Sequence, residues 1–362
     1  MANSLGAHGV GIGLFGSNFA KESLGRGVSQ FQSKGSWSGG DWYPLSALNL
    51  PTLVRNIPSL VSRGRMIQDY DVVISELGSA WQAIWFKSFN RVPILLDEHN
   101  VEWHLMRQLQ VSSGNPHPWE RLRTYERVCH RIFDHITVVS NVDKHSFEAE
   151  GTPSHKITTV PNGVDTGEFR PDATAREQLR SEYGVQNDCP LLMYMGSFKF
   201  FPNVDAINTI LRTIFPQAKE LIPNLRLMVI GPGSESIPLG GTPDIISPGV
   251  VERSVLPSYI NCADICIAPL RFGSGTRFKI LEWMACGKAV IATRRAAEGI
   301  DVTHGKDIIL EDDTSKYPVL VSNIWKDGEL NAAIGRNART LVEENYSWEK
   351  CIAPLERSLR TL

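Results

Sequence analysis

Residues 265–293 read ICIAPLRFGSGTRFKILEWMACGKAVIAT, a pattern that predicts a strand, a glycine-rich turn, a helix and a second strand. The apolar run 265–269 precedes a Gly/Ser turn, and helical spacing of apolar residues extends from about Thr276 to Cys286. Gly287 ends that helix, and the apolar run 289–293 begins the next strand. The segment is therefore typical of a βαβ unit in a parallel sheet, whose ligands bind at the carboxyl ends of strands.

Short apolar runs of this kind recur along the chain and alternate with longer amphipathic segments. Continuous rather than alternating apolar residues are typical of parallel strands covered on both faces. The runs are 71–76, 93–97, 136–140, 157–160, 191–196, 225–231, 244–247, 265–269, 289–293 and 307–310. The number of predicted strands is larger than one ordinary sheet usually contains. The pattern therefore predicts an α/β protein with two doubly wound parallel-sheet domains.

The turn-rich, polar segment beginning at residue 162 marks the break between these domains. We place the N-terminal domain at residues 1–170 and the C-terminal domain at residues 171–347. The last predicted helix, 348–362, has no strand after it, and we assign it to the N-terminal domain.

Composition and charge exclude several classes of protein. The 362 residues are 42% hydrophobic and 21% charged, ordinary values for a soluble globular protein. A formal net charge of −2 argues against a dedicated nucleic-acid binder. The six cysteines form no CxxC pair, and no His completes a zinc set, so we expect no metal and six buried thiols in a reducing compartment. No apolar run approaches the ~20 residues that span a bilayer, and residues 1–30 lack a secretory pattern, so we expect a cytoplasmic protein.

The first part of the chain is unusual. Residues 1–40 hold ten of the 30 glycines, and we expect this stretch to be irregular, with no clear opening strand. GIGLFG (11–16) matches a dinucleotide-binding pattern, but without a strand before it and an acidic residue after it the match is weak. Residues 49–66 carry three arginines and no acid. An ordinary surface helix is favoured there, and peripheral contact with the inner face of an anionic membrane is the alternative.

The predicted helix that begins near Thr276 has the features of a phosphate site. A Gly-rich turn before a helix exposes backbone N–H groups, and the helix dipole favours an anion there. Arg277 and Lys279 occupy the first turn, where cations are disfavoured unless an anion compensates them. Glu282 shares a face with Lys279, one turn below, where it could accept two ribose hydroxyls. The alternative is two solvated cations, with Glu282 merely paired to Lys279.

This segment resembles the nucleotide-sugar site of GT-B glycosyltransferases of family 4 (glycosyl transferases group 1). Other segments are similar to the same family in the same order along residues 70–362. They are LLDEHNVEWHLMRQL (95–109), ITVVSNVDKHSF (136–147), TTVPNGVDTGEFRP (158–171), LLMYMGSFKFFPNVDAI (191–207), SPGVVERSVLPSYINCADICIAPL (247–270) and ENYSWEKC (344–351).

The resemblance implies a GT-B fold, with two Rossmann-like domains facing across a cleft. It implies a hexosyltransferase-type glycosyltransferase that moves a sugar from a UDP- or GDP-linked donor to an acceptor hydroxyl. The acceptor, a glycan, a glycolipid or a small molecule, is not identified, and the resemblance implies a role in polysaccharide biosynthesis. Family members are typically retaining and metal-independent, so we expect no cofactor and no metal.

The resemblance also implies positions for the donor. Glu282 matches the second glutamate of the family's paired-glutamate motif and is expected to hold the ribose. Gly275 and Thr276 are expected to donate backbone N–H groups to the diphosphate, and Val250 and Val251 to lie beside the base.

Departures from the family pattern affect the remaining assignments. Ser274 stands where the first glutamate would be, and Ser197 and Asn203 replace a frequent arginine and lysine after Gly196, the glycine that ends the first strand of the C-terminal domain. Neutralisation of the phosphates is therefore assigned to basic residues nearby, namely Lys199, Arg271, Arg277 and Lys279.

Two more residues complete the predicted site. His99, at a strand end of the N-terminal domain, is expected to lie near the transferred sugar and, with Arg277 and Lys279, to take part in catalysis. Glu298, after the strand 289–293, could reach the donor sugar. We predict a glycosyltransferase; the alternatives are a catalytically weak GT-B-like subunit that binds nucleotide sugars, and a GT-B nucleotide-sugar epimerase.

Overall fold

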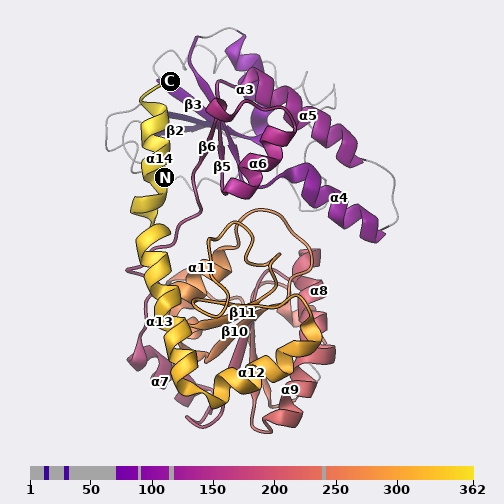
Figure 1. Ribbon diagram of the computed structural model, residues 1–362, viewed down its shortest axis with the longest axis vertical. Coiled ribbons are helices and arrows are strands. Elements are labelled where there is room, and N and C mark those ends of the chain that lie inside the picture. Colours follow the sequence, from indigo (N-terminus) through magenta and orange to yellow (C-terminus); the bar gives the residue numbers. More distant parts are fainter. Residues whose placement is uncertain (1–11, 16–27, 32–70, 89–90, 114–117, 239–241) are drawn as a thin grey trace. The chain divides into compact units, whose positions relative to one another are not determined.

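The computed structural model describes residues 12–15, 28–31, 71–88, 91–113, 118–238 and 242–362. The chain forms two compact units (Figure 1). The first unit comprises Met1–Pro161 and Ile352–Leu362, and the second unit comprises Asn162–Cys351. Each unit contains one six-stranded sheet. The predicted architecture of two parallel-sheet α/β units is therefore confirmed.

The first unit has the strand order β2-β1-β3-β4-β5-β6, and all neighbours are parallel. The strands are β1 Ile12–Phe15, β2 Val28–Phe31, β3 Val72–Glu76, β4 Ile94–Glu98, β5 His135–Val138 and β6 Ile157–Thr159. The four strands predicted for this part of the sequence, from 71–76 to 157–160, are confirmed. Buried apolar side chains such as Ile94, Leu96 and Ile136 form the core beside them.

The expectation that residues 1–40 contain no opening strand is wrong. Strand β1 lies inside GIGLFG and pairs in parallel with both β2 and β3, with Ile12 opposite Val28 and Val72. Pairing along both edges explains why a segment of weak strand propensity forms a strand, because sheet context outweighs intrinsic preference. Gly13 lies within this strand rather than in a turn after one, which also argues against a dinucleotide loop.

The helices of the first unit follow its strands. They are η3 Leu77–Ser79, α3 Ala80–Lys87, α4 Glu102–Ser113, α5 Pro118–Ile132, α6 Asn141–Ala149 and η4 Ser154–Lys156. The amino end of α4 is capped from α5, because the Glu102 N–H donates to the buried Glu126 carboxylate at 3.0 Å. A carboxylate at a helix amino end satisfies a free donor and complements the dipole, which fixes α4 against α5.

The second unit has the strand order β12-β11-β10-β7-β8-β9, again all parallel. The strands are β7 Leu191–Met195, β8 Arg226–Ile230, β9 Ile245–Gly249, β10 Ile265–Ala268, β11 Ala289–Ala292 and β12 Ile309–Leu310, all at predicted positions. The chain adds β8 and β9 on one side of β7 and then returns to place β10 on the other side. The carboxyl ends of β7 and β10 therefore form a topological switch point, where open α/β sheets bind ligands.

Helices cover both faces of this sheet (Figure 1). Helix α7 packs on α10, α11 on α13, and α9 on α12. The helices are α7 Ala173–Glu182, α8 Phe201–Thr209, the π-helical turn η5 Ile210–Ile214, α9 Phe215–Leu221, η6 Ser234–Ser236, η7 Arg253–Val255, α10 Leu256–Cys262, α11 Phe278–Ala285, η8 Thr314–Lys316, α12 Tyr317–Lys326, α13 Gly328–Asn345 and α14 Trp348–Leu359.

A buried arginine joins α7 to the amino edge of the second sheet. The Arg180 side chain is 2% exposed and donates to Asp264 Oδ2 at 3.1 Å and to the Cys262 carbonyl at 3.0 Å. Its other terminal nitrogen donates to the carbonyls of Gln186 and Cys189, each at 2.6 Å. Asp264 Oδ2 also accepts from the Leu191 N–H at 2.8 Å, so the charge pair ties α7 to the starts of β7 and β10.

The units divide at Pro161 and Cys351, whereas the sequence placed the boundaries at residues 170 and 347. Packing explains the difference. Phe169 is fully buried in the core of the second unit, and the Val164 N–H donates to the Tyr346 carbonyl at 2.8 Å. Arg339 donates to the carbonyls of Thr166 and Phe169 at 2.9 and 2.5 Å, so residues 162–170 belong to the second unit by contact. Helix α14 begins in the second unit and ends in the first.

The predictions about cysteines and membrane spans can be compared with the described residues, whereas the prediction about residues 49–66 cannot. All six cysteines are buried free thiols, as expected. In the described ranges, none of the helices combines the length and apolar character needed to cross a bilayer. The arginine-containing stretch 49–66 lies outside the described residues.

Candidate functional site

The candidate site lies in the second unit, in the two loops that follow β7 and β10. Because these strands are neighbours at the switch point, the loops 196–200 and 269–277 start side by side. The loop after β8 joins them, since a Cβ added at Gly231 would lie 2.1 Å from the Gly196 carbonyl oxygen. Gly231 also has φ +135°, a conformation that only glycine adopts readily.

The loop after β10 winds tightly into α11. Gly273 and Gly275 have φ values of +139° and +73°, and the side chains of Ser274 and Thr276 are buried between them and the helix. Helix α11 begins at Phe278, and Arg277 is its N-cap residue, so the predicted start at Thr276 is two residues early.

Arg277 shapes this loop. Its guanidinium folds back and donates to the Ser274 carbonyl and, at 2.7 Å, to the Gly275 carbonyl. A Cβ on Gly273 would lie 1.8 Å from Arg277 Nη2, so the guanidinium occupies space that glycine leaves open. The alternative of a fully solvated Arg277 is therefore wrong, and the placement of Arg277 in the first helical turn is corrected to the N-cap.

Lys279 reaches from α11 to the loop after β7. Its ammonium donates to Asn203 Oδ1 at 2.9 Å and lies 4.6 Å from the centre of the Tyr194 ring. Burial, followed by the nearby Arg277 charge, lowers the pKa of Lys279 to about 7, against a smaller opposing effect of Glu282. Although part of the side chain is exposed, its ammonium is thus in an environment that disfavours charge.

Glu282 is buried and pairs with Arg253, not with Lys279. Its Oε1 accepts from Arg253 Nη1 at 3.0 Å, while Arg253 is 61% exposed and lies over the Phe169 ring at 5.0 Å. Burial raises the pKa of Glu282, and the Arg253 charge opposes that rise. The simple Lys279–Glu282 pair, which the sequence left as an alternative, is therefore not formed.

The other predicted basic groups differ in their surroundings. The Arg271 guanidinium makes a two-point ion pair with Asp205 of α8, with Nε 2.9 Å from Oδ2. Lys199 is exposed in the loop after β7. Arg277 and Lys279 both have neutral hydrogen-bond partners, and Lys279 differs from Arg277 in that burial lowers its pKa to about 7.

The remaining donor residues surround the same edge of the sheet. Val250 is 70% exposed after β9, and Val251 packs against the core. Glu298, after β11, pairs with Arg295, and burial raises the pKa of Glu298 while the Arg295 and Arg277 charges lower it.

His99 lies in the first unit, directly after β4. Its Nε2 is 3.7 Å from Asp97 Oδ2 and 4.0 Å from Glu76 Oε1. Glu76 and Asp97 are register partners on β3 and β4, so the imidazole faces two carboxylates at the carboxyl edge of that sheet. The sequence reasoning missed Glu76 because the pairing of β3 with β4 is what brings it beside His99.

Glu98, which lies between Asp97 and His99 in the sequence, points to the opposite face of the sheet and has a structural role. It pairs with His130 at 3.2 Å, and both side chains are buried. His130 Nδ1 lies 2.9 Å from Thr152 Oγ1, so the buried imidazole has partners on both ring nitrogens.

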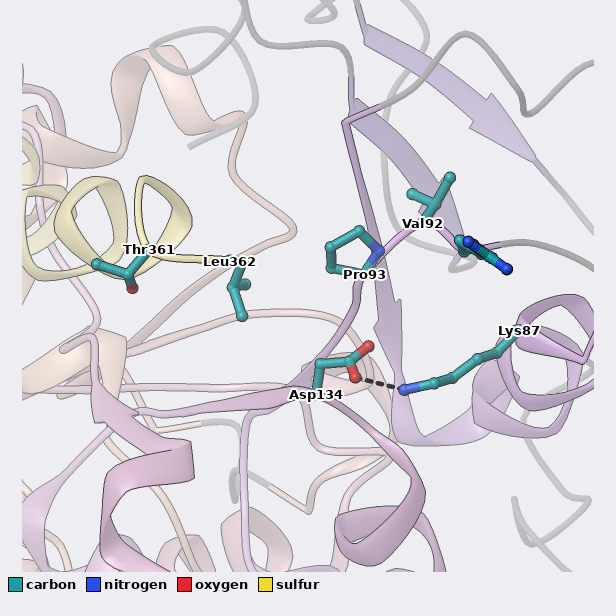
Figure 2. Close-up of a pocket in the computed structure, with 7 residues that line it drawn as sticks. Lys87, Val92, Pro93, Asp134, Thr361 and Leu362 are labelled. Atoms are coloured by element: carbon teal, nitrogen blue, oxygen red, sulfur yellow. Dashed lines mark hydrogen bonds and ion pairs between the residues drawn. The ribbon is translucent and has the colours of Figure 1, made fainter.

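A cavity of about 520 Å³ opens elsewhere in the first unit (Figure 2). It is lined by Lys87, Arg91, Val92, Pro93, Asp134, Thr361 and Leu362. Residues 91–93 and Asp134 precede β4 and β5, so the cavity lies at the amino edge of that sheet, opposite His99. Since parallel α/β sheets bind ligands at the carboxyl edge, this cavity is not the candidate active site.

Two active-site features were not predicted. Arg253 pairs with Glu282, and Tyr194 supports Asn203, although neither contact follows from spacing in the sequence. Within the part of the chain that the structure describes, His, Cys, Asp and Glu side chains form no group of three or more placed to hold a metal ion.

Two parallel α/β units, one of them with a cation-bearing helix start at its switch point, define a Rossmann-like class of nucleotide-binding protein. Comparison with known families makes the assignment specific. Residues 2–168 match the family model described as Glycosyltransferase Family 4, and residues 189–326 match the one described as Glycosyl transferases group 1. The chain belongs to this glycosyltransferase family, as its sequence motifs predicted.

Curated relatives carry the same type of activity. The chain is 25% identical over 344 residues to the GDP-mannose-dependent alpha-(1-6)-phosphatidylinositol monomannoside mannosyltransferase of Mycolicibacterium smegmatis, covering 89% of this chain and 85% of the relative. It is 26% identical to the D-inositol 3-phosphate glycosyltransferase of Xylanimonas cellulosilytica, covering 79% of this chain and 70% of the relative.

Solved structures agree on the fold. Anabaena Alr3699/HepE in complex with UDP and glucose aligns with a TM-score of 0.76 at 14% identity, covering 98% of this chain and all of that one. Sucrose-phosphate synthase from Thermosynechococcus elongatus aligns with a TM-score of 0.76 at 18% identity, covering 99% and 91% of the two chains. The predicted GT-B fold is confirmed.

Proposed function

We propose that this glycosyltransferase moves a hexosyl group from a nucleotide diphosphate sugar to an acceptor hydroxyl, and that the second unit binds the nucleotide. The observation that carries the proposal is the start of α11. There Lys279 and Glu282, one turn apart on one helix, present a cation and a buried carboxylate at the switch point of the sheet. A diphosphate needs a cation beside it, and the two hydroxyls of a ribose fit a carboxylate.

Each group has a distinct task in this scheme. The Lys279 ammonium and the N–H groups at the helix start stabilise the negative charge that grows on the departing diphosphate. The Glu282 carboxylate accepts hydrogen bonds from the ribose hydroxyls after releasing Arg253. Arg277 keeps the loop carbonyls of Ser274 and Gly275 turned toward its own guanidinium, which fixes the course of the loop into α11.

The stereochemistry and the acceptor are part of the proposal. We infer retention of configuration from the family resemblance alone. Catalysis without a metal ion is supported by the cationic residues at the switch point, which supply the positive charge that the leaving group needs. We infer a hydroxyl-rich acceptor, which could be a glycan, a glycolipid or a small molecule, and a role in polysaccharide biosynthesis. The relatives named for phosphatidylinositol monomannoside and for D-inositol 3-phosphate support a glycolipid and a small molecule respectively.

His99 stays a predicted catalytic residue. Its imidazole beside Asp97 and Glu76 is a suitable proton acceptor or hydrogen-bond donor for a sugar hydroxyl. Replacement of His99 by Ala should then lower kcat more than it weakens donor binding.

Isothermal titration with GDP-mannose and UDP-glucose, together with a transfer assay using glycolipid acceptors, tests the proposal. Glu282→Ala should weaken donor binding by ~1–3 kcal/mol, the scale of lost buried hydrogen bonds. Glu329→Ala, in an exposed ion pair of α13, is the matched control and should leave binding unchanged. Unchanged affinity in Glu282→Ala would remove the ribose assignment.

A second candidate is a GT-B-like subunit that binds nucleotide sugars with weak catalysis. It is favoured by Ser274, which is buried where the family's first glutamate is expected. Binding without turnover, with any acceptor offered, would support this candidate. Formation of an isomer of the donor sugar without acceptor would instead support an epimerase.

A further inference from the structure

We propose that Asn203, fixed by Tyr194, is the positioning residue that holds the Lys279 ammonium for the donor diphosphate, and that donor binding is accompanied by uptake of a proton at Lys279. This inference rests on the proposed function and deepens it. It assigns a task to a neutral amide where the family often has a second cation.

Three elements bring these side chains together. Tyr194 comes from β7, Asn203 from the first turns of α8, and Lys279 from α11. Asn203 Oδ1 accepts from the Tyr194 hydroxyl at 3.0 Å and from Lys279 Nζ at 2.9 Å. Both donors therefore converge on one oxygen at the switch point between β7 and β10.

The orientation of the Asn203 amide is set by its other contacts. Its Nδ2 donates to the Ser197 carbonyl at 3.0 Å. A flipped amide would turn NH₂ toward the ammonium and its oxygen toward that carbonyl, losing the hydrogen bonds to Lys279 and to Ser197. Gly196 provides the space, because a Cβ there would lie 2.8 Å from Asn203 Cγ and Oδ1. Gly196 therefore acts through Asn203 in this proposal.

The charges around Lys279 leave room for an anion. Arg277 at the helix start repels the ammonium, and Glu282 on the same helix attracts it but is paired with Arg253. Asp205, from α8, is engaged by Arg271. Among the described residues, no carboxylate lies within 4.0 Å of the ammonium, which is held by an amide oxygen and a buried aromatic ring. The missing counter-charge is what a donor diphosphate would supply.

The direction of the pH effect follows. Burial lowers the pKa of Lys279 to about 7, so in the free protein the ammonium loses its proton as the pH rises past neutrality. A bound diphosphate favours the charged form and raises that pKa. Donor affinity should therefore be greatest below pH 7 and should fall by up to tenfold per pH unit above it, until the pKa of the complex is reached.

Titration of UDP-glucose and GDP-mannose into wild-type protein between pH 6.0 and 8.5 tests the coupling. The diphosphate of a nucleotide sugar is a diester, so the ligand lacks the phosphate ionisation near pH 6 that UDP itself would add. We expect the affinity for whichever of the two nucleotide sugars binds to fall about tenfold between pH 6.0 and pH 8.5. Lys279→Met should bind more weakly at pH 6 and show no such fall.

Asn203→Asp tests the positioning role. A carboxylate about 3 Å from the ammonium should raise the pKa of Lys279 and move the fall in affinity at least one pH unit higher, whatever it does to affinity itself. Asn337→Asp, on the exposed face of α13, is the matched control and should keep the wild-type pH profile. A merely structural Asn203 would change affinity equally at every pH.

Tyr194→Phe provides a second test if the Asp variant does not fold, as judged by circular dichroism. It keeps the ring under Lys279 but removes the hydroxyl that fixes Asn203, so the donor KM should rise severalfold with little change in kcat. Donor binding with a flat pH profile in wild type, or an unmoved profile in Asn203→Asp, would overturn the inference and leave the proposed function standing. Failure of both nucleotide sugars to bind at any pH would overturn both.

Discussion

The two edges of the second unit's sheet bury a cation in opposite ways. At the amino edge, Arg180 is 2% exposed and is compensated by the Asp264 carboxylate and by carbonyls at 2.6–3.0 Å. At the carboxyl edge, the partners of Lys279 among the residues that the structure describes are the amide oxygen of Asn203 and the ring of Tyr194. A buried charge that the protein compensates itself serves stability, whereas one left without a counter-charge at a switch point suits a ligand.

Replacing each cation by methionine is the most direct way to break this comparison. Arg180→Met should lower the free energy of unfolding by ~3–5 kcal/mol, because it leaves the buried Asp264 and several carbonyls with fewer partners. Lys279→Met should keep or raise that free energy, since the folded state disfavours the ammonium. Urea unfolding of both variants measures the difference, and an Arg180→Met variant more stable than Lys279→Met would contradict the division of roles.

Two neighbouring glycines, Gly335 and Gly287, test whether the amino edge of the second unit's sheet is packed as closely as the Arg180–Asp264 ion pair suggests. A Cβ on Gly335 of α13 would lie 2.1 Å from the Gly287 carbonyl oxygen, at the end of α11. Gly335→Ala should therefore destabilise by ~1–3 kcal/mol, although alanine is normally the better helix former. Gly328→Ala at the start of the same helix, where a Cβ meets nothing within 4 Å, is the control and should not destabilise. Thermal unfolding distinguishes the two variants.

The smallest effect is expected at the exposed partner of Glu282. Arg253 is 61% exposed, and buried Glu282, whose pKa burial already raises, can take up a proton when this partner is lost, so Arg253→Ala should lower the free energy of unfolding by only about 1 kcal/mol. Donor affinity should change less than threefold, because the ribose replaces Arg253 at the carboxylate. Arg294→Ala, in an exposed ion pair with Asp312, is the control for titration calorimetry. A loss above tenfold would show that Arg253 itself contacts the donor.

Sequence patterns predicted the strands from residue 71 onward because continuous apolar runs with β-branched residues signal strands covered on both faces. They missed β1 and β2. Strand β1 contains Gly13, which has weak strand propensity, and it pairs on both edges within the sheet. The start of α11 was predicted within two residues, since Gly-rich turn and helical periodicity are both local signals. The partners of its charged groups were not predicted, because Arg253 and Asn203 come from other helices, η7 and α8.

The amino-acid sequence alone determined the two parallel α/β units, the family, and the segment 271–293 that carries the charged groups, since each depends on local periodicity or on an ordered set of motifs. Only the tertiary structure decided which charges meet. Strand order places the loops after β7 and β10 side by side, and this juxtaposition gives Lys279 an amide instead of a carboxylate and gives Glu282 an arginine instead of Lys279. Contacts between residues distant in sequence are set by sheet topology, which no local pattern encodes.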